Sequence, residues 1–233
     1  MKVDILAITA HPDDVELCCS GILLHHIAQG KKVGIVDLTQ GELGTRGDGP
    51  TRLKEAAEAA KILGVEFRDN LGLADGFFKI DKDNQLPIIQ AIRKYQPKIV
   101  ITNTVNDRHP DHGRAAKLVS EACFLAGLIK VDTGQDRWRP KNIYHVIQDF
   151  YHHPDIVIDI TAYMEKKMEA VKAFKSQFYN PSSNEPDSPI SSEEFIDFIH
   201  SRAAEMGRRI GVQYAEGLTV AKPVGVNSLF DLY

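Results

Sequence analysis

The tripeptide His-Pro-Asp occurs three times in this sequence, and two of the copies carry an additional side chain of a metal-binding type. Residues 10–14 read AHPDD, and residues 108–112 read RHPDH. Each of these two copies follows an apolar run that predicts a buried strand and precedes a segment that predicts a helix. Proline suits the first turn of a helix and stiffens such a corner. Imidazoles and carboxylates gathered at two corners of this kind predict a metal site.

Three of these side chains fit the requirements of a hydrolytic zinc site, which takes three nitrogen or oxygen ligands from the protein and keeps one position for water. His11 and Asp14 are spaced so that they can converge on one ion from the strand end and the first helical turn. His112 then supplies the third ligand. We expect one Zn²⁺ per chain, and Fe²⁺ or Co²⁺ also suits this donor set.

The remaining motif residues, Asp13, His109 and Asp111, are candidates for catalysis. Adjacent side chains at a corner diverge, so Asp13 should point away from Asp14 and act as general base toward the water that the metal activates. His109 can donate a hydrogen bond or a proton to the developing oxyanion or to the leaving group. Asp111 is suited to orient an imidazole.

The other histidines form no comparable constellation. The third His-Pro-Asp copy, at residues 153–155, precedes a strand and has no further ligand beside it, so we assign it a structural role. His25, His26 and His200 lie within predicted helices, and His145 alternates within a predicted strand. Packing or surface exposure is the ordinary role of a histidine in such positions.

Strands and helices alternate through most of the chain. β-Branched apolar runs predict strands at residues 3–9, 32–38, 98–103, 142–149 and 156–160, and apolar spacing predicts helices at residues 15–28, 51–63, 86–95 and 113–126. This alternation favours a Rossmann-like α/β fold, with a mostly parallel sheet covered by helices on both faces. Ligands of such sheets bind at the carboxyl ends of the strands, which places the metal site at that edge.

We interpret residues 1–233 as a single domain with a mixed, largely helical C-terminal portion from about residue 161 to 233. Helices are expected at residues 162–175 and 191–210. The segment between them, residues 176–192, is rich in Ser, Pro and Asn and is a candidate lid. No internal repeat and no clean linker divides the chain.

The composition excludes several partners. The chain carries 28 Lys+Arg and 32 Asp+Glu, a formal net charge of −4, and lacks long basic runs, which argues against nucleic acid and anionic membranes. No apolar run approaches the about 20 residues that span a bilayer. Three cysteines, two of them adjacent, suit a reducing cytoplasm better than a disulfide framework. We therefore expect a cytoplasmic protein with a small-molecule partner, and a homo-oligomer is an open alternative to a monomer.

The segments AHPDDVE (residues 10–16) and RHPDH (residues 108–112) resemble the LmbE/PIG-L family of zinc-dependent N-deacetylases, and the resemblance extends along most of the chain. DLTQGELGTRG (37–47), SQF (176–178), GVQYAEGLTVAKPV (211–224) and NSLFDL (227–232) are similar to the branch with the bacillithiol-biosynthesis deacetylases. Members of that branch remove the acetyl group from N-acetylglucosaminyl malate. The resemblance implies the same activity here.

Carried over residue by residue, the resemblance implies the zinc ligands named above and the same roles for Asp13 and His109. It further implies that Arg52 contacts substrate, and Arg139 is a weaker match of the same kind. Arginines form bidentate pairs with carboxylates, so Arg52 with Arg46 or Arg139 would make an anion clamp for a malate-bearing sugar.

Competing interpretations remain at this point. The substrate can instead be another N-acetyl amino sugar, such as N-acetylglucosamine or a chitooligosaccharide. A metallophosphoesterase would bring two metals about 4 Å apart, and the carboxylates here are few for two ions. A non-enzymatic sensor on a Rossmann-like scaffold would need a nucleotide fingerprint, which residues 7–21 lack. Glu16 fits the family motif as a support of the site, but it equally suits a first helical turn, where acids favour the helix dipole.

Overall fold

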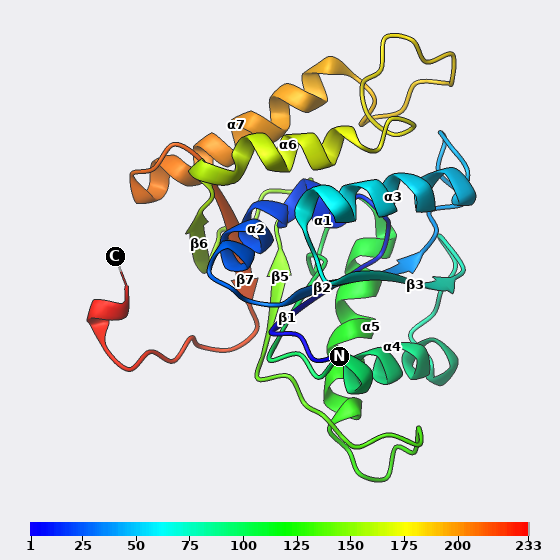
Figure 1. Cartoon of the computed structure of the whole chain (residues 1–233), viewed down its shortest axis with the longest axis vertical. Coiled ribbons are helices and arrows are strands. Elements are labelled where there is room, and N and C mark those ends of the chain that lie inside the picture. The colour runs from blue at the N-terminus through cyan, green and yellow to red at the C-terminus, as the bar shows by residue number, and fades with distance from the viewer. Residues whose placement is uncertain (233) are drawn as a thin grey trace.

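The computed structural model describes residues 1–232. Its seven-stranded sheet has the order β3-β2-β1-β4-β5-β7-β6 (Figure 1). The strands are β1 (Ile5–Thr9), β2 (Val33–Thr39), β3 (Phe67–Leu73), β4 (Ile99–Thr102), β5 (Asn142–Val146), β6 (Ile156–Asp159) and β7 (Ala215–Val220). The first five pair in parallel, whereas β7 runs antiparallel to both β5 and β6. The predicted Rossmann-like, mostly parallel sheet is confirmed.

Helices cover both faces of this sheet. They are α1 (Asp14–Cys18), α2 (Ser20–Ala28), α3 (Gly49–Leu63), α4 (Lys82–Tyr95), α5 (Pro110–Ala126), α6 (Met164–Lys172) and α7 (Glu193–Ile210), with short 3₁₀ turns η1 (Thr161–Tyr163) and η2 (Leu229–Asp231). Helices α4 and α5 lie on one face, and α1, α2 and α3 lie on the other, with α6 and α7 beyond them (Figure 1). None of the helices among the described residues has the length and apolar character that crossing a bilayer requires.

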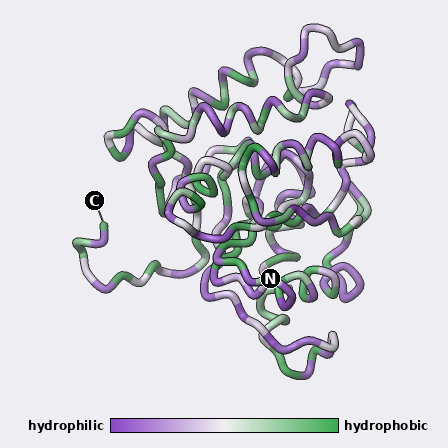
Figure 2. Tube along the Cα trace, in the orientation of Figure 1, coloured by the Kyte–Doolittle hydropathy of each residue, from purple (hydrophilic) through white to green (hydrophobic). Residues whose placement is uncertain are grey.

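The central strands are apolar on both faces because helices bury each face. Along β1, Ile5 and Ala7 belong to the core under α2 and α3, and Leu6 and Ile8 belong to the core under α4 and α5. Figure 2 shows hydrophobic residues gathered in this interior. Strands buried on both faces read as continuous apolar runs, which is why the sequence reveals them.

The predicted helix at residues 15–28 is in fact two helices, because the chain breaks at Cys19 (φ −146°, ψ 6°). Side chains from the C-terminal portion take over the backbone groups that the break exposes. Lys167 Nζ donates to the carbonyl oxygens of Glu16 and Leu17, each at 2.8 Å. The Glu216 carboxylate accepts the backbone N–H of Ile22 at 2.7 Å, and it pairs with Lys167 at 2.7 Å. Local spacing carries no sign of such distant partners.

Two strands lie where no strand was expected. The stretch after α3, interpreted as irregular, contains β3, and the end of the chain contains β7. β3 is an edge strand with polar, half-buried residues, so it lacks the apolar run that marks the central strands. β7 inserts between β5 and β6, which joins the C-terminal portion to the same sheet.

Candidate metal and active site

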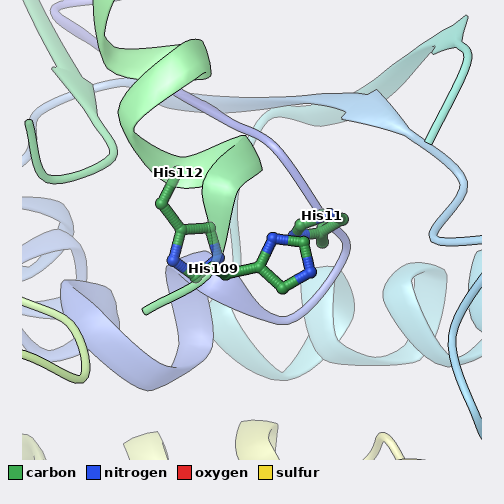
Figure 3. A group of neighbouring side chains, drawn as sticks. All are labelled: His11, His109 and His112. Atoms are coloured by element: carbon green, nitrogen blue, oxygen red, sulfur yellow. The ribbon is translucent and has the colours of Figure 1, made fainter. Parts of the chain in front are cut away.

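Both extended His-Pro-Asp corners lie at one edge of the sheet. β1 ends at Thr9, just before the first corner, and β4 ends at Thr102, shortly before the second. These two strands are neighbours at the point where the strand order reverses, which is where open α/β sheets bind ligands. Figure 3 shows the imidazoles of His11, His109 and His112 facing one another. One nitrogen from each ring lies within 4.8 Å of the others.

The Asp14 carboxylate lies between two of these imidazoles. Its Oδ1 is 3.2 Å from Nε2 of His112, and its Oδ2 is 3.6 Å from Nδ1 of His11. Although burial alone would raise the pKa of the Asp14 carboxyl, the two imidazoles hold this pKa well below its usual range. Asp14 therefore contacts both imidazoles with which it is predicted to share an ion, and their role as ligands stays a prediction.

A carboxylate binds the far nitrogen of each of these two rings. His112 donates from Nδ1 to Asp107 at 2.6 Å, and His11 donates from Nε2 to Asp75 at 3.0 Å. In the neutral rings this assignment leaves His112 Nε2 and His11 Nδ1, the nitrogens on the Asp14 side, with the lone pairs that a metal ion would take. Histidines that bind metals show the same arrangement, in which a carboxylate fixes the tautomer.

The donor set fits a divalent cation of the zinc type. Two imidazoles and a carboxylate are nitrogen and oxygen ligands of the kind that zinc takes, and Asp14 approaches His112 through Oδ1 at 3.2 Å and His11 through Oδ2 at 3.6 Å. The carboxylates around these imidazoles also favour a bound cation. Burial opposes the protonated imidazole, yet nearby carboxylates raise the pKa of His112 to about 9. The site thus favours positive charge at this point.

Asp13 points away from the cluster toward Arg52. Its backbone has φ 127°, a region that non-glycine residues seldom occupy outside functional sites. Oδ2 accepts a 2.7 Å hydrogen bond from Arg52, which also donates to the carbonyl oxygens of Pro12 and Gly41. A Cβ on Gly41 would lie 1.9 Å from the Arg52 guanidinium, so only glycine fits there. Burial raises the pKa of Asp13 to about 7, although Arg52 opposes this shift.

His109 is the N-cap residue of α5, which begins three residues earlier than the sequence suggested. Its Nδ1 accepts the backbone N–H of Asp111 at 3.3 Å, so the ring proton of the neutral form belongs on Nε2. Burial and the other two imidazoles lower the pKa of His109, which favours that neutral form.

Of the other predicted site residues, Asp111 and Arg46 lie at the site, whereas Arg139 does not. Asp111 is fully buried, lies 3.4 Å from Nε2 of His11 and pairs with Arg114, so it contacts an imidazole of the first motif. Arg46 lines the cavity described below. Arg139 is not brought to the site. It precedes β5 at the opposite edge of the sheet, where it donates to the carbonyl oxygen of Phe124 and lies over that ring.

Glu16 does not line this site. Its carboxylate instead takes part in a buried ion cluster behind α1. Its carboxylate is fully buried and lies 2.7 Å from Nη1 of Arg68, which also binds Asp37 of β2 at 2.7 Å. Burial raises the pKa of Glu16 against the effect of Arg68. The cluster ties α1 to β2 and β3, an arrangement that the helix-dipole interpretation does not include.

Sequence reasoning missed the amides that hold Asp14. Asn103, just after β4, donates from Nδ2 to Asp14 Oδ2 at 2.9 Å, and Gln148, after β5, donates from Nε2 to Asp14 Oδ1 at 3.0 Å. Asn103 Nδ2 also donates to Gln148 Oε1 at 2.9 Å. Their position at strand ends on the same edge was the one available signal.

A cavity of 330 Å³ opens in front of the cluster. Besides the motif residues, its lining includes Arg46, Arg108 and Arg202 as cationic groups and Gln177, Ser188, Pro189, Ile190 and Phe195 from the C-terminal portion. The predicted loop at residues 176–192 therefore forms part of its wall. The size lies within the range of small-molecule sites.

The fold and site define a Rossmann-like α/β protein with a histidine–aspartate centre that can hold a metal. Residues 6–123 match the family profile of PIG-L, described as GlcNAc-PI de-N-acetylase. Diacetylchitobiose deacetylase of Thermococcus kodakarensis is 30% identical over 92% of this chain and 81% of that protein. The chain belongs to the PIG-L family, and it is an enzyme.

Two further comparisons agree with this membership. The conserved protein TT1542 of Thermus thermophilus superposes with a TM-score of 0.88 at 33% identity, covering 97% of this chain and 98% of that one. A probable N-acetyl-alpha-D-glucosaminyl L-malate deacetylase 2 of Bacillus anthracis is 27% identical over 75% of this chain and 81% of that protein. The resemblance seen in the motifs is thereby confirmed at the level of the family.

Proposed function

We propose that this protein is a zinc-dependent N-deacetylase that removes the acetyl group from an N-acetylglucosaminyl conjugate, with N-acetylglucosaminyl malate of bacillithiol biosynthesis as its substrate. Membership of the PIG-L family and relatives that deacetylate N-acetylglucosamine-type sugars support the N-deacetylase activity. His11, Asp14 and His112 would hold the zinc ion, which when bound polarises the amide carbonyl and lowers the pKa of water.

The side chains beside the cluster supply the proton transfers that amide hydrolysis needs. Because Arg52 holds Oδ2 of Asp13, we assign Oδ1 of Asp13 to take the proton from the attacking water. The neutral His109 donates a hydrogen bond from Nε2 to the oxygen of the tetrahedral intermediate, and Asp13 returns the proton it took from water to the departing amine. Asp111 acts by keeping the His11 ring in place, so we regard it as a positioning residue.

The observation that carries the choice of an acidic substrate is Arg46. This side chain is 4% exposed and lines the cavity, and its Nε has no hydrogen-bond partner among residues 1–232. A buried guanidinium whose Nε makes no hydrogen bond within the protein favours a carboxylate brought by the substrate. Arg52 was also expected to bind a substrate carboxylate, but it is already bound to Asp13. We therefore assign the substrate's carboxylate to Arg46 alone.

The experiment is acetate release by the zinc-loaded enzyme from N-acetylglucosaminyl malate, N-acetylglucosamine and diacetylchitobiose. We expect the highest kcat/KM for the malate conjugate, and Arg46→Gln should reduce that preference. Equal kcat/KM on all three would refute the malate assignment and leave the deacetylase intact. If zinc-loaded protein released acetate from none of them, the deacetylase proposal would fail as well.

Two accompanying properties are also proposals. A cytoplasmic location is supported by the buried, free thiols of Cys18, Cys19 and Cys123, which suit a reducing compartment. A homo-oligomer stays a prediction that sedimentation of the purified protein can test.

A further inference from the structure

The Arg46 guanidinium is close to a carboxylate of the protein's own chain. Glu185 Oε2 lies 3.9 Å from Arg46 Nε, and it is the one carboxylate within ion-pair distance of Arg46 among the described residues. Glu185 Oε1 accepts the backbone N–H of Gly47 at 2.7 Å. The same side chain therefore contacts both Arg46 and the residue after it.

The two partners of this ion pair differ in their exposure to solvent. The Arg46 side chain is 4% exposed, whereas the Glu185 side chain is 42% exposed. A separation of 3.9 Å with water on one side makes a weak ion pair, since surface pairs are largely screened. A carboxylate that approached Arg46 from the cavity would meet the guanidinium at shorter, bidentate distances.

The loop that carries Glu185 also forms part of the cavity. Ser188, Pro189 and Ile190 line it, three to five residues beyond Glu185. On the facing side, Gln177 Nε2 donates to the Arg46 carbonyl oxygen at 2.6 Å, which fixes the backbone at Arg46. The backbone at Arg46 is thus anchored by Gln177, whereas Glu185, the carboxylate nearest its guanidinium, belongs to a more exposed segment.

We propose that Glu185 is a specificity-determining residue, whose carboxylate stands in for a substrate carboxylate at Arg46 and is displaced when an acidic substrate binds. This inference rests on the proposed function, because it assigns the substrate's carboxylate to Arg46. When an acidic substrate binds, its carboxylate replaces that of Glu185 beside Arg46. A neutral sugar offers no replacement and leaves the Glu185 contact in place.

The test measures binding of L-malate to the zinc-loaded protein by isothermal titration calorimetry. Glu185→Gln keeps an oxygen for the Gly47 N–H and removes the charge, so it should bind L-malate about two- to five-fold more tightly than wild type. Asp187→Asn makes the same charge change two residues away on the exposed loop, and should leave the malate Kd unchanged. Arg46→Gln should weaken binding and abolish the gain from Glu185→Gln.

The outcomes separate this inference from the proposed function. A Glu185→Gln protein that binds L-malate no more tightly than wild type overturns the role of Glu185. A gain that persists in the Arg46→Gln, Glu185→Gln double variant, or an equal gain in Asp187→Asn, also overturns it. If the malate conjugate is not deacetylated, the proposed function fails, while the calorimetry still reports on Glu185. The thermal midpoint of each variant verifies that the fold is retained.

Discussion

Replacing Arg52 with methionine should destabilise the substrate-free protein, because the structure gives this arginine a partner inside the protein. Arg52 is 4% exposed, and its guanidinium donates to Asp13, Pro12 and Gly41. Methionine leaves the buried Asp13 carboxylate without its cation and two carbonyl oxygens without a donor. Breaking a buried ion pair by removing one partner costs about 3–5 kcal/mol. We expect the free energy of unfolding to fall by that amount at a pH well above the Asp13 pKa of about 7, where the carboxyl is ionised in the wild-type protein.

The assay is urea unfolding of chelator-treated protein, so that metal binding to the native state does not contribute to the measured stability. Arg137→Met, at an exposed position, is the matched control and should change the stability by less than about 0.5 kcal/mol. A double-mutant cycle with Asp13→Asn isolates the pair. The double variant should be less destabilised than the sum of the single variants by about 2–3 kcal/mol.

Two results would refute this reasoning. If Arg52→Met costs less than about 1 kcal/mol, well under the cost of breaking a buried pair, the guanidinium is not a structural partner of Asp13, and its role lies in substrate contact alone. If the two substitutions are additive, Arg52 stabilises the loop through its backbone bonds and not through Asp13. Arg52→Lys restores the charge without the planar fork and should recover only part of the loss.

Three further substitutions test other parts of the structure. Lys167→Met should cost about 3–5 kcal/mol in urea unfolding because it removes a buried cation, whereas exposed Lys166→Met on the same helix should be nearly neutral. Gln148→Leu should weaken zinc affinity about 10- to 100-fold in a chelator competition, since an amide that holds Asp14 is lost; unchanged affinity would contradict that role. Gly34→Ala places a Cβ 2.3 Å from the Phe67 ring and should lower the free energy of unfolding by about 1–3 kcal/mol. If this clash is the cause, a smaller residue at position 67 should restore part of the loss.

The sequence predicts the centre of the site well because the strand-to-helix corners are local. His11 and Asp14 are three residues apart, and the apolar runs before and after them reveal the strand and the helix. The placement of His112 beside them follows from one rule, that parallel strands present their carboxyl ends at the same edge. Spacing and this rule together place His11, Asp14 and His112, the proposed ligands, at one edge of the sheet.

What surrounds this centre lies beyond local reasoning. Asp75 and Gln148 follow β3 and β5, and each reaches the cluster through a loop whose course no periodicity specifies. Arg139 shows the opposite error, since a residue matched by resemblance lies at the other edge of the sheet. For Arg52, only the three-dimensional structure reveals that the guanidinium holds Asp13.

The short helix α1 explains why the C-terminal portion is needed for a site made by N-terminal motifs. A five-residue helix is far below the length at which a helix is stable alone, yet α1 begins at Asp14 and directly follows Asp13. Lys167 of α6 satisfies the carbonyl oxygens at its end, and Glu216 of β7 both pairs with Lys167 and caps the next helix. Loss of this pair should therefore disturb Asp14, the proposed metal ligand, and Asp13, the proposed general base, together. The motifs specify the chemistry, but distant residues stabilise the backbone on which it depends.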